Sequence, residues 1–240
     1  METGKTIIMN KIIEITNKYY PLTSSQAEKL SIISEKLTEM NGVLNLTALK
    51  TDEEIAILHF FDSLTLLKTG LFTGKSIIDI GCGGGFPSLP LAVCSDKCTV
   101  TANDSTAKKL NFVEETVKTI GITNLKTLFG RAEEIARTQK RESFDIAVAR
   151  GVARLNILCE LCLPLVKKGG HFVAMKGSKG AEELEEAEKA IKALGGKTVD
   201  IINVDVPLFD RKHTLIVIEK VVATSNDFPR QYAKITKAPL

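Results

Sequence analysis

The chain has 240 residues, of which 44% are hydrophobic and 25% charged, so it can build a sizeable core but is too polar for a membrane protein. Its net charge of +3, from 32 Lys and Arg against 29 Asp and Glu, is too small by itself to indicate a polyanionic partner. The five cysteines indicate no disulfide framework, no apolar run could span a membrane, and the start, Met-Glu-Thr-Gly-Lys, lacks a signal-peptide pattern. These features predict a cytoplasmic protein with reduced thiols.

Residues 1–70 are predicted to form an N-terminal helical extension packed on the rest of the chain. Apolar side chains recur every three or four positions over 24–40 and again over 52–68, which is the helical period. His59 and Asp62 are three positions apart in the second segment and would share one helix face. The other two histidines are remote in sequence, so we predict a packed histidine here rather than a metal ligand.

Residues 71–225 are predicted to form the main domain, because strands and helices alternate there. Seven strands are predicted, over 76–80, 99–103, 126–129, 144–149, 171–176, 198–204 and 214–220. Most of them are separated by helical patterns, notably 105–120, 156–166 and 180–194. The predicted fold class is therefore α/β, a Rossmann-like, seven-stranded, mostly parallel sheet. The last two strands have no helix between them and should form an antiparallel hairpin.

A glycine-rich loop follows the first predicted strand, in the run Asp79-x-Gly81-x-Gly83-x-Gly85-Phe86. Glycine lets the backbone approach a ligand closely, and in sheets of this kind ligands bind at the carboxyl ends of the strands. A dinucleotide fingerprint requires glycine at its sixth position, which is Phe86 when counted from Gly81. The spacing is instead typical of class I methyltransferases that bind S-adenosylmethionine. A purely structural turn is the alternative.

Asp104 follows the second strand, 23 residues after Gly81, about where a dinucleotide-binding fold places its ribose carboxylate. A carboxylate there can accept hydrogen bonds from both ribose hydroxyls. The alternative is a helix N-cap, because a helical pattern follows directly. Gly130 to Glu134 follow the third strand, where a loop could touch the adenine edge of the same ligand or simply begin a charged helix.

Short motifs spread over most of the chain resemble the glucose-inhibited division protein B family. The glycine loop alone is typical only of the wider superfamily, whereas residues 59–64 and the Pro-Arg segment near the end are much more specific. The matching segments are Asn45-Leu46-Thr47-Ala48, His59 to Leu64, Asp79 to Pro87, Asp104-Ser105 with Lys108-Lys109, Gly130 to Glu134, Ala149-Arg150, Lys176-Gly177, His213 to Ile218, Phe228-Pro229-Arg230 and Lys237 to Leu240.

The resemblance implies an S-adenosylmethionine-dependent enzyme that methylates the N7 atom of a specific guanine in 16S rRNA of the small ribosomal subunit. The residues it implies as contacts of S-adenosylmethionine are Gly81, Phe86, Ala132, Glu133 and Arg150. The loop and the second strand add further cofactor-binding candidates, namely Asp79, Gly83, Gly85 and Asp104.

Guanine N7 carries a lone pair and no proton, so it can attack a sulfonium methyl group without a general base. Catalysis should then consist of positioning the reacting atoms in line. We predict that Arg150 orients the cofactor or its target, with a buried structural ion pair as the alternative role. Gly151 stands where the family usually has alanine, and its freedom could loosen the backbone that aims Arg150.

An RNA substrate requires basic side chains that hold phosphates. The guanine N7 edge lies in the deep major groove of A-form RNA, so the target should be in a loop or extruded from its stack. The predicted phosphate contacts are Lys108, Lys109, Arg154, Lys176, Lys179, Arg211, Lys212, Arg230, Lys234 and Lys237. The last three belong to residues 226–240, a basic tail that could equally be a solvated terminus. We expect a monomer without a bound metal.

Two other functions stay open at this point. A methyltransferase for a small molecule or a protein would have a closed apolar pocket and no salt-dependent RNA affinity. An RNA-binding or assembly factor that retains the cofactor fold would bind ribosomal particles but transfer no methyl group. If the glycine loop binds the cofactor, replacing Gly81 with Val should crowd that ligand while leaving the sheet folded.

Overall fold

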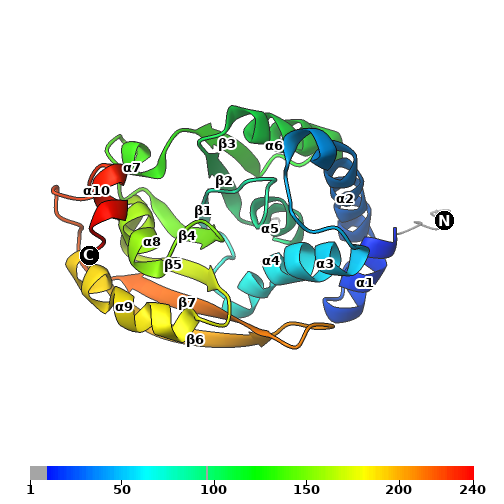
Figure 1. The fold of residues 1–240 in the computed structure, drawn as a ribbon. Coiled ribbons are helices and arrows are strands. Elements are labelled where there is room, and N and C mark those ends of the chain that lie inside the picture. Colours follow the sequence, from blue (N-terminus) through cyan, green and yellow to red (C-terminus); the bar gives the residue numbers. More distant parts are fainter. Residues whose placement is uncertain (1–9, 96) are drawn as a thin grey trace.

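The computed structural model describes residues 10–95 and 97–240, and its centre is a seven-stranded sheet in the order β3-β2-β1-β4-β5-β7-β6 (Figure 1). Strands β1 to β5 pair in parallel, whereas β7 pairs antiparallel with both β5 and β6. The strands are β1 (Ser76–Ile80), β2 (Thr99–Asp104), β3 (Leu125–Phe129), β4 (Phe144–Arg150), β5 (Val166–Lys176), β6 (Gly196–Asp205) and β7 (Lys212–Lys220). The predicted Rossmann-like sheet with its C-terminal hairpin is confirmed.

One face of the sheet is covered by the N-terminal helices together with two helices of the main domain, on the right in Figure 1. Leu30, Phe60, Leu89 and Val113 from four of these helical elements share one buried cluster with Ile77 of β1. The elements are α1 (Lys11–Tyr19), α2 (Ser24–Leu44), α3 (Asp52–Ile55), the π-helix η1 (Ala56–Phe61), α4 (Asp62–Thr65), the 3-10 turn η2 (Leu66–Thr69), α5 (Ser88–Cys94) and α6 (Ala107–Ile120).

The opposite face is covered by α7 (Ala132–Ile135), α8 (Leu155–Cys162), the 3-10 turn η3 (Leu163–Leu165), α9 (Gly180–Ala193) and α10 (Tyr232–Lys237). Successive side chains of a strand point to opposite faces, so Ile78 joins this second cluster while its neighbour Ile77 belongs to the first. Both faces are therefore buried, which explains the continuous apolar runs of the central strands.

Two predicted helices differ from the structure. The helix expected over 156–166 ends as α8 at Cys162, and η3 with Pro164 leads directly into β5 at Val166. Proline has no amide hydrogen to continue an α-helix, which accounts for the change. The helix expected over 52–68 is instead four consecutive helical pieces, α3, η1, α4 and η2, with a π-helical turn in the middle.

Residues 226–240 do not form an extended tail. They run back over the protein and end in α10, which packs on α8 with Ile235 fully buried (Figure 1, red). Within the described residues, no helix has the length and apolar character needed to cross a membrane. The first nine residues, which include the start used to argue against a signal peptide, lie outside the described residues.

Candidate functional site

A cavity of about 380 Å³ lies at the carboxyl ends of four parallel strands, and we call it the glycine-loop cavity. Gly81 follows β1, Asp104 ends β2, Gly130 follows β3 and Gly151 follows β4, so the four strand ends meet there. Its full lining is Ile80, Gly81, Gly83, Asn103, Asp104, Ser105, Lys109, Gly130, Arg131, Ala132, Glu133, Gly151, Val152, Leu161 and Tyr232.

Asp104 connects the glycine loop to the start of α6. Its Oδ2 accepts a hydrogen bond from the Gly83 amide at 3.0 Å, and its Oδ1 accepts one from the Thr106 amide at 2.8 Å. A carboxylate has about four acceptor positions, so the same side chain can still accept hydroxyl groups of a ligand in the cavity. The two roles that the sequence leaves open for Asp104 are therefore compatible.

Four predicted cofactor residues point away from this cavity. Asp79 is fully buried, and its Oδ2 accepts hydrogen bonds from the amide and the hydroxyl of Ser88 at 3.2 and 2.5 Å. A Cβ on Gly85 would meet Leu89 in the core at 2.5 Å. Phe86 packs in the first cluster, and Arg150 lines a different cavity. The structure brings together the other five, namely Gly81, Gly83, Asp104, Ala132 and Glu133.

The second cavity, of about 510 Å³, is called the histidine cavity here because His59 and His213 both line it. Arg150 connects its walls: Nη1 donates to Asp62 Oδ2 at 3.1 Å and Nη2 contacts His59 Nδ1 at 2.9 Å. The other carboxylate oxygen of Asp62, Oδ1, accepts a hydrogen bond from His213 Nδ1 at 2.8 Å. The full lining is Leu46, Thr47, Ala48, Leu49, Leu58, His59, Asp62, Arg150, Gly151, Met175, Lys176, Gly177, Glu183 and His213.

The π-helical turn η1 supplies a further partner for Arg150. In an α-helix the Asp62 amide would donate to the carbonyl of Leu58, four residues earlier. Here it donates to the carbonyls of Ile57 and His59 instead, and the Leu58 carbonyl accepts a hydrogen bond from Arg150 Nη1 at 2.8 Å. Single π-turns are frequent at functional sites, and this one frees the carbonyl that fixes Arg150.

Burial sets the charge states in this network. It lowers the pKa of His59 to about 3, and the neighbouring Arg150 charge acts in the same direction. His59 is therefore neutral, with Nδ1 facing the Arg150 donor and Nε2 donating to Thr47 Oγ1 at 2.7 Å. Burial alone would raise the pKa of Asp62, but the His213 hydrogen bond and the Arg150 charge hold it below the ordinary carboxyl value. The predicted packed histidine at position 59 stacks on Phe86, with ring centroids 4.5 Å apart.

The two cavities share one wall residue, Gly151. It has φ +66°, a left-handed conformation that glycine adopts readily, so here glycine suits the backbone that follows Arg150. The loop that follows is held by Lys176, whose Nζ donates to the Ala153 carbonyl at 2.9 Å and pairs with Glu183 at 2.7 Å. The Lys176 ammonium thus stabilises the wall between the cavities from a buried position.

The remaining predicted phosphate contacts fall into three groups. Arg154 pairs with Glu186, and Arg230 pairs with the buried Glu160, so both guanidinium groups already have carboxylate partners. Lys109 is half-buried at the glycine-loop cavity. The other six side chains are exposed to solvent, as is Arg154; they are Lys108, Lys179, Arg211, Lys212, Lys234 and Lys237.

A family model described as rRNA small subunit methyltransferase G matches residues 26–213. The chain belongs to this family. The ribosomal RNA small subunit methyltransferase G of Clostridium perfringens is 41% identical over 215 residues, which cover 89% of this chain and 90% of that protein. The protein of the same name from Lactobacillus acidophilus is 38% identical over 233 residues, with coverages of 95% and 97%.

The fold is also similar to that of solved structures of low sequence identity. TYW2 from M. jannaschii, in complex with AdoMet, superposes with a TM-score of 0.50 at 16% identity and covers 67% of this chain and 77% of its own. At that identity the likeness concerns the fold alone. The predicted family and the predicted class of enzyme, an rRNA methyltransferase, are confirmed by the sequence relatives.

In this member of the rRNA small subunit methyltransferase G family, several cavity residues were not predicted from the sequence. Arg131, Val152 and Tyr232 line the glycine-loop cavity, and His213 lines the histidine cavity. Arg131 lies within a segment singled out for its position after β3. For Tyr232 and His213, nothing in the local pattern indicates the contact, because each comes from an element far along the chain.

Proposed function

We propose that this chain transfers a methyl group from S-adenosylmethionine to the N7 atom of a guanine in 16S rRNA of the small ribosomal subunit. Membership of the rRNA small subunit methyltransferase G family supports the RNA substrate. The observation that carries the proposal is the pair of cavities that meet at Gly151. Methyl transfer requires the methyl donor and the acceptor base to be bound a short distance apart. A ribosomal substrate would place the reaction in the cytoplasm.

The glycine-loop cavity suits the methyl donor. Gly81 and Gly83 both have positive φ and line the cavity with backbone atoms, which a ligand can approach closely because no side chain is present. Asp104 and Glu133 add two carboxylates, which match ribose hydroxyls and the positive charges of the ligand. When bound, S-adenosylmethionine supplies a methyl group activated by its sulfonium charge. The volume of about 380 Å³ is within the usual range for small-molecule sites.

The histidine cavity suits the target base. Guanine N7 needs no general base. Both ring nitrogens of the neutral His59 already contact Arg150 and Thr47, so His59 shapes the cavity wall and does not accept a proton from the substrate. Methylation at N7 makes the purine cationic. In the same lining the carboxylates of Asp62 and Glu183 balance the charges of Arg150 and Lys176, so these four side chains present no net positive charge against it. Arg150 bonds the Leu58 carbonyl, Asp62 and His59, so it aligns η1 and β4 with Gly151 and fixes the wall between the two cavities.

RNA phosphates have basic side chains available beside the histidine cavity. Arg211 and Lys212 directly precede His213, and both are exposed. A base that enters a cavity of this kind must leave its stack, which agrees with a target in a loop or an extruded nucleotide. We propose that these two side chains hold the backbone of the target strand.

A methylation assay tests the proposed function. The protein is incubated with radiolabelled S-adenosylmethionine and, in separate reactions, small subunits that lack this modification, free 16S rRNA and a metabolite extract. We expect label in ribosomal RNA and chain scission at one guanine after borohydride and aniline treatment, which cleaves at 7-methylguanine. Label confined to metabolites or protein would favour the small-molecule alternative. Binding to small subunits without label would favour an idle assembly factor.

A further inference from the structure

Tyr232 lines the glycine-loop cavity although it belongs to the C-terminal segment, residues 226–240. Its ring lies under the guanidinium of Arg131, with Arg131 Cζ 4.3 Å from the ring centroid. Arg131 follows β3 and donates from Nε to Glu133 Oε1 at 2.6 Å, so its guanidinium is held on both sides. The cavity therefore has an aromatic wall that comes from the far end of the chain.

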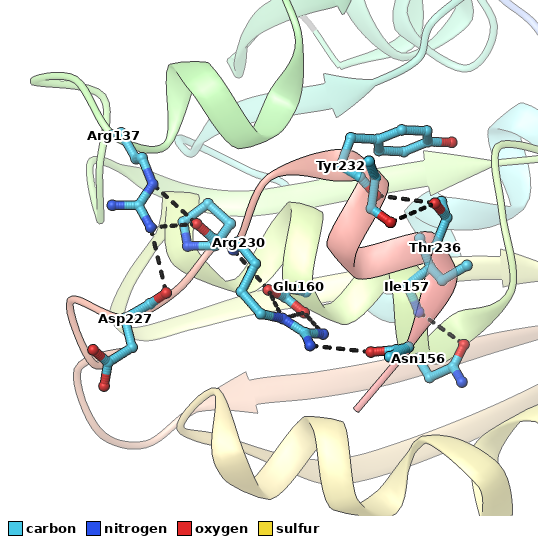
Figure 2. A network of polar contacts seen from close by, with 11 residues as sticks. Arg137, Asn156, Ile157, Glu160, Asp227, Arg230, Tyr232 and Thr236 are labelled. Atoms are coloured by element: carbon cyan, nitrogen blue, oxygen red, sulfur yellow. Dashed lines mark hydrogen bonds and ion pairs between the residues drawn. The ribbon is translucent and has the colours of Figure 1, made fainter.

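The C-terminal segment is held in place by a buried ion pair, shown in Figure 2. The Glu160 side chain on α8 is 1% exposed and pairs with Arg230. Arg230 donates from its backbone amide, Nε and Nη2 to Glu160 oxygens at 2.7, 2.9 and 2.6 Å. Its Nη1 donates to the Ala238 carbonyl at 3.0 Å, which closes α10 onto the same arginine. A buried carboxylate with several charge-assisted hydrogen bonds gives a geometry that is costly to break.

Two more arginines bind the backbone of this segment. Arg137 donates from Nε and Nη2 to the Pro229 carbonyl at 2.9 and 2.6 Å (Figure 2). Arg141 donates to the Phe228 carbonyl at 2.8 Å and to the Thr224 carbonyl at 2.7 Å. Side chains from residues 137–160 thus hold residues 224–238 at many points. Tyr232 is positioned before any ligand arrives, and little conformational freedom remains to be lost on binding.

The place of Tyr232 along the cavity indicates what it contacts. Asp104 at the end of β2 suits the ribose, and Arg131 and Ala132 follow β3, the neighbouring strand. A nucleoside with its ribose at Asp104 would extend its base toward this β3 loop. The Tyr232 ring and the Arg131 guanidinium lie there, and both surfaces stack well on a purine.

We propose that the C-terminal segment is a fixed wall of the methyl-donor site, in which Tyr232 and Arg131 form the platform for the adenine base. This inference rests on the proposed function, because it requires an adenosyl ligand in the glycine-loop cavity. It assigns the segment to the donor rather than to RNA. Of the three basic side chains predicted to bind phosphate in this segment, Arg230 anchors the wall and Lys234 and Lys237 are exposed.

Calorimetric titration with S-adenosylhomocysteine tests the platform. Tyr232→Ala should weaken binding about tenfold, because removal of one base–aromatic stack costs on the order of 1–3 kcal/mol and 1.4 kcal/mol corresponds to tenfold. Tyr232→Phe keeps the ring and should bind as the wild type does. Lys234→Ala is the matched control: it changes an exposed residue on the same helix that does not line the cavity, and it should leave the affinity unchanged.

Further measurements separate the platform from a folding effect and from an RNA contact. Thermal unfolding of the ligand-free variants should match the wild type, and free adenosine should lose affinity for Tyr232→Ala by the same factor as S-adenosylhomocysteine. Unchanged affinity of Tyr232→Ala for both nucleosides would overturn the inference. So would a loss confined to small-subunit binding. Either result would leave the proposed function intact, provided that the wild type binds S-adenosylhomocysteine and methylates rRNA.

Discussion

His213 Nδ1 lies 2.8 Å from Asp62 Oδ1, although 151 residues separate the two in the chain. The contact joins β7 to the N-terminal helices, and Arg150 adds β4 through the other oxygen of Asp62. One buried carboxylate therefore connects three elements around the histidine cavity. His213 is remote in sequence from His59 and Asp62, yet the fold places all three in one lining.

Replacing this carboxylate should lower methyl transfer and stability but leave the affinity for the methyl donor unchanged. Asp62→Asn removes the charge that pairs with Arg150 and His213, so we expect methyl transfer to fall at least about tenfold and stability to fall by about 3 kcal/mol, as for other broken buried pairs. Affinity for S-adenosylhomocysteine should not change, because Asp62 does not line the glycine-loop cavity. Urea unfolding, calorimetry and the methylation assay measure the three quantities. Asp52→Asn, which breaks an exposed pair with Lys11, is the control and should leave all three quantities close to those of the wild type.

The neutral state of His59 predicts a distinct acid sensitivity. Its folded pKa of about 3 lies below the value of 6.5 expected in the unfolded chain, so only the unfolded state binds the proton between these values. This residue therefore reduces stability as pH falls below 6.5, by up to about 1.4 kcal/mol per pH unit. His59→Gln should remove that contribution, which urea unfolding at pH 7 and pH 5 would show. An imidazole NMR signal of His59 that titrates near pH 6.5 would contradict the neutral assignment.

Asp79 predicts the opposite dependence. Burial raises its folded pKa to about 6 from 3.8, so folding carries a penalty that is absent below pH 3.8 and complete above pH 6. Asp79→Asn keeps an acceptor for Ser88 and removes the charge. The ligand-free variant should be more stable than the wild type at pH 8, by on the order of 2 kcal/mol, with the difference shrinking toward pH 4. Because His59 and Asp79 act in opposite directions between pH 6 and 4, each variant has to be compared with the wild type at the same pH.

Substitution of Gly81 should lower the stability of the ligand-free protein, because a side chain there would clash with a neighbouring residue. It has φ +71°, and a Cβ there would lie 2.6 Å from Val152 Cγ2. The sequence predicts that Gly81→Val crowds the cofactor and leaves the sheet folded, but the structure shows a clash with Val152 of the protein itself. Gly81→Ala should therefore destabilise the ligand-free enzyme by more than about 2 kcal/mol, the upper cost of the left-handed conformation alone.

Two comparisons isolate that clash. Gly121→Ala shares the positive φ at +65° but has open space around its Cβ, so it should show only the backbone cost. Adding Val152→Ala to Gly81→Ala should recover most of the difference between the two glycine variants. Equal stability losses for Gly81→Ala and Gly121→Ala would show that Val152 moves aside without cost.

The proposed RNA contact predicts a change in salt dependence. Replacing both Arg211 and Lys212 with alanine should weaken binding to small subunits and reduce the slope of log affinity against log salt by about two, one for each lost phosphate contact. Affinity for S-adenosylhomocysteine should not change. The control is Lys189 and Lys192 replaced together, since both are exposed on α9 and line neither cavity. An unchanged salt slope would remove these two residues from the RNA surface.

The succession of strands along the chain, the class of sheet and the position of the ligand loop could all be read from the sequence. Strands buried on both faces are continuous apolar runs, and a helical period is visible whenever one helix face packs on a sheet. The glycine spacing after β1 located the cavity, and Asp104 followed from its place after β2. These are local patterns, since each depends on neighbours within a few positions along the chain.

Only the tertiary structure decided which side chains meet. Gly81 and Gly83 face the cavity while Gly85 faces the core, a difference that depends on how the loop is folded back. His213 reaches Asp62 because β7 pairs antiparallel with β5, with Thr214 opposite Lys176. Tyr232 joins the glycine loop because Arg230 finds the buried Glu160. Such contacts are set by strand order and by ion pairs between elements that are distant in the chain. Neither can be predicted from the periodicity of the sequence.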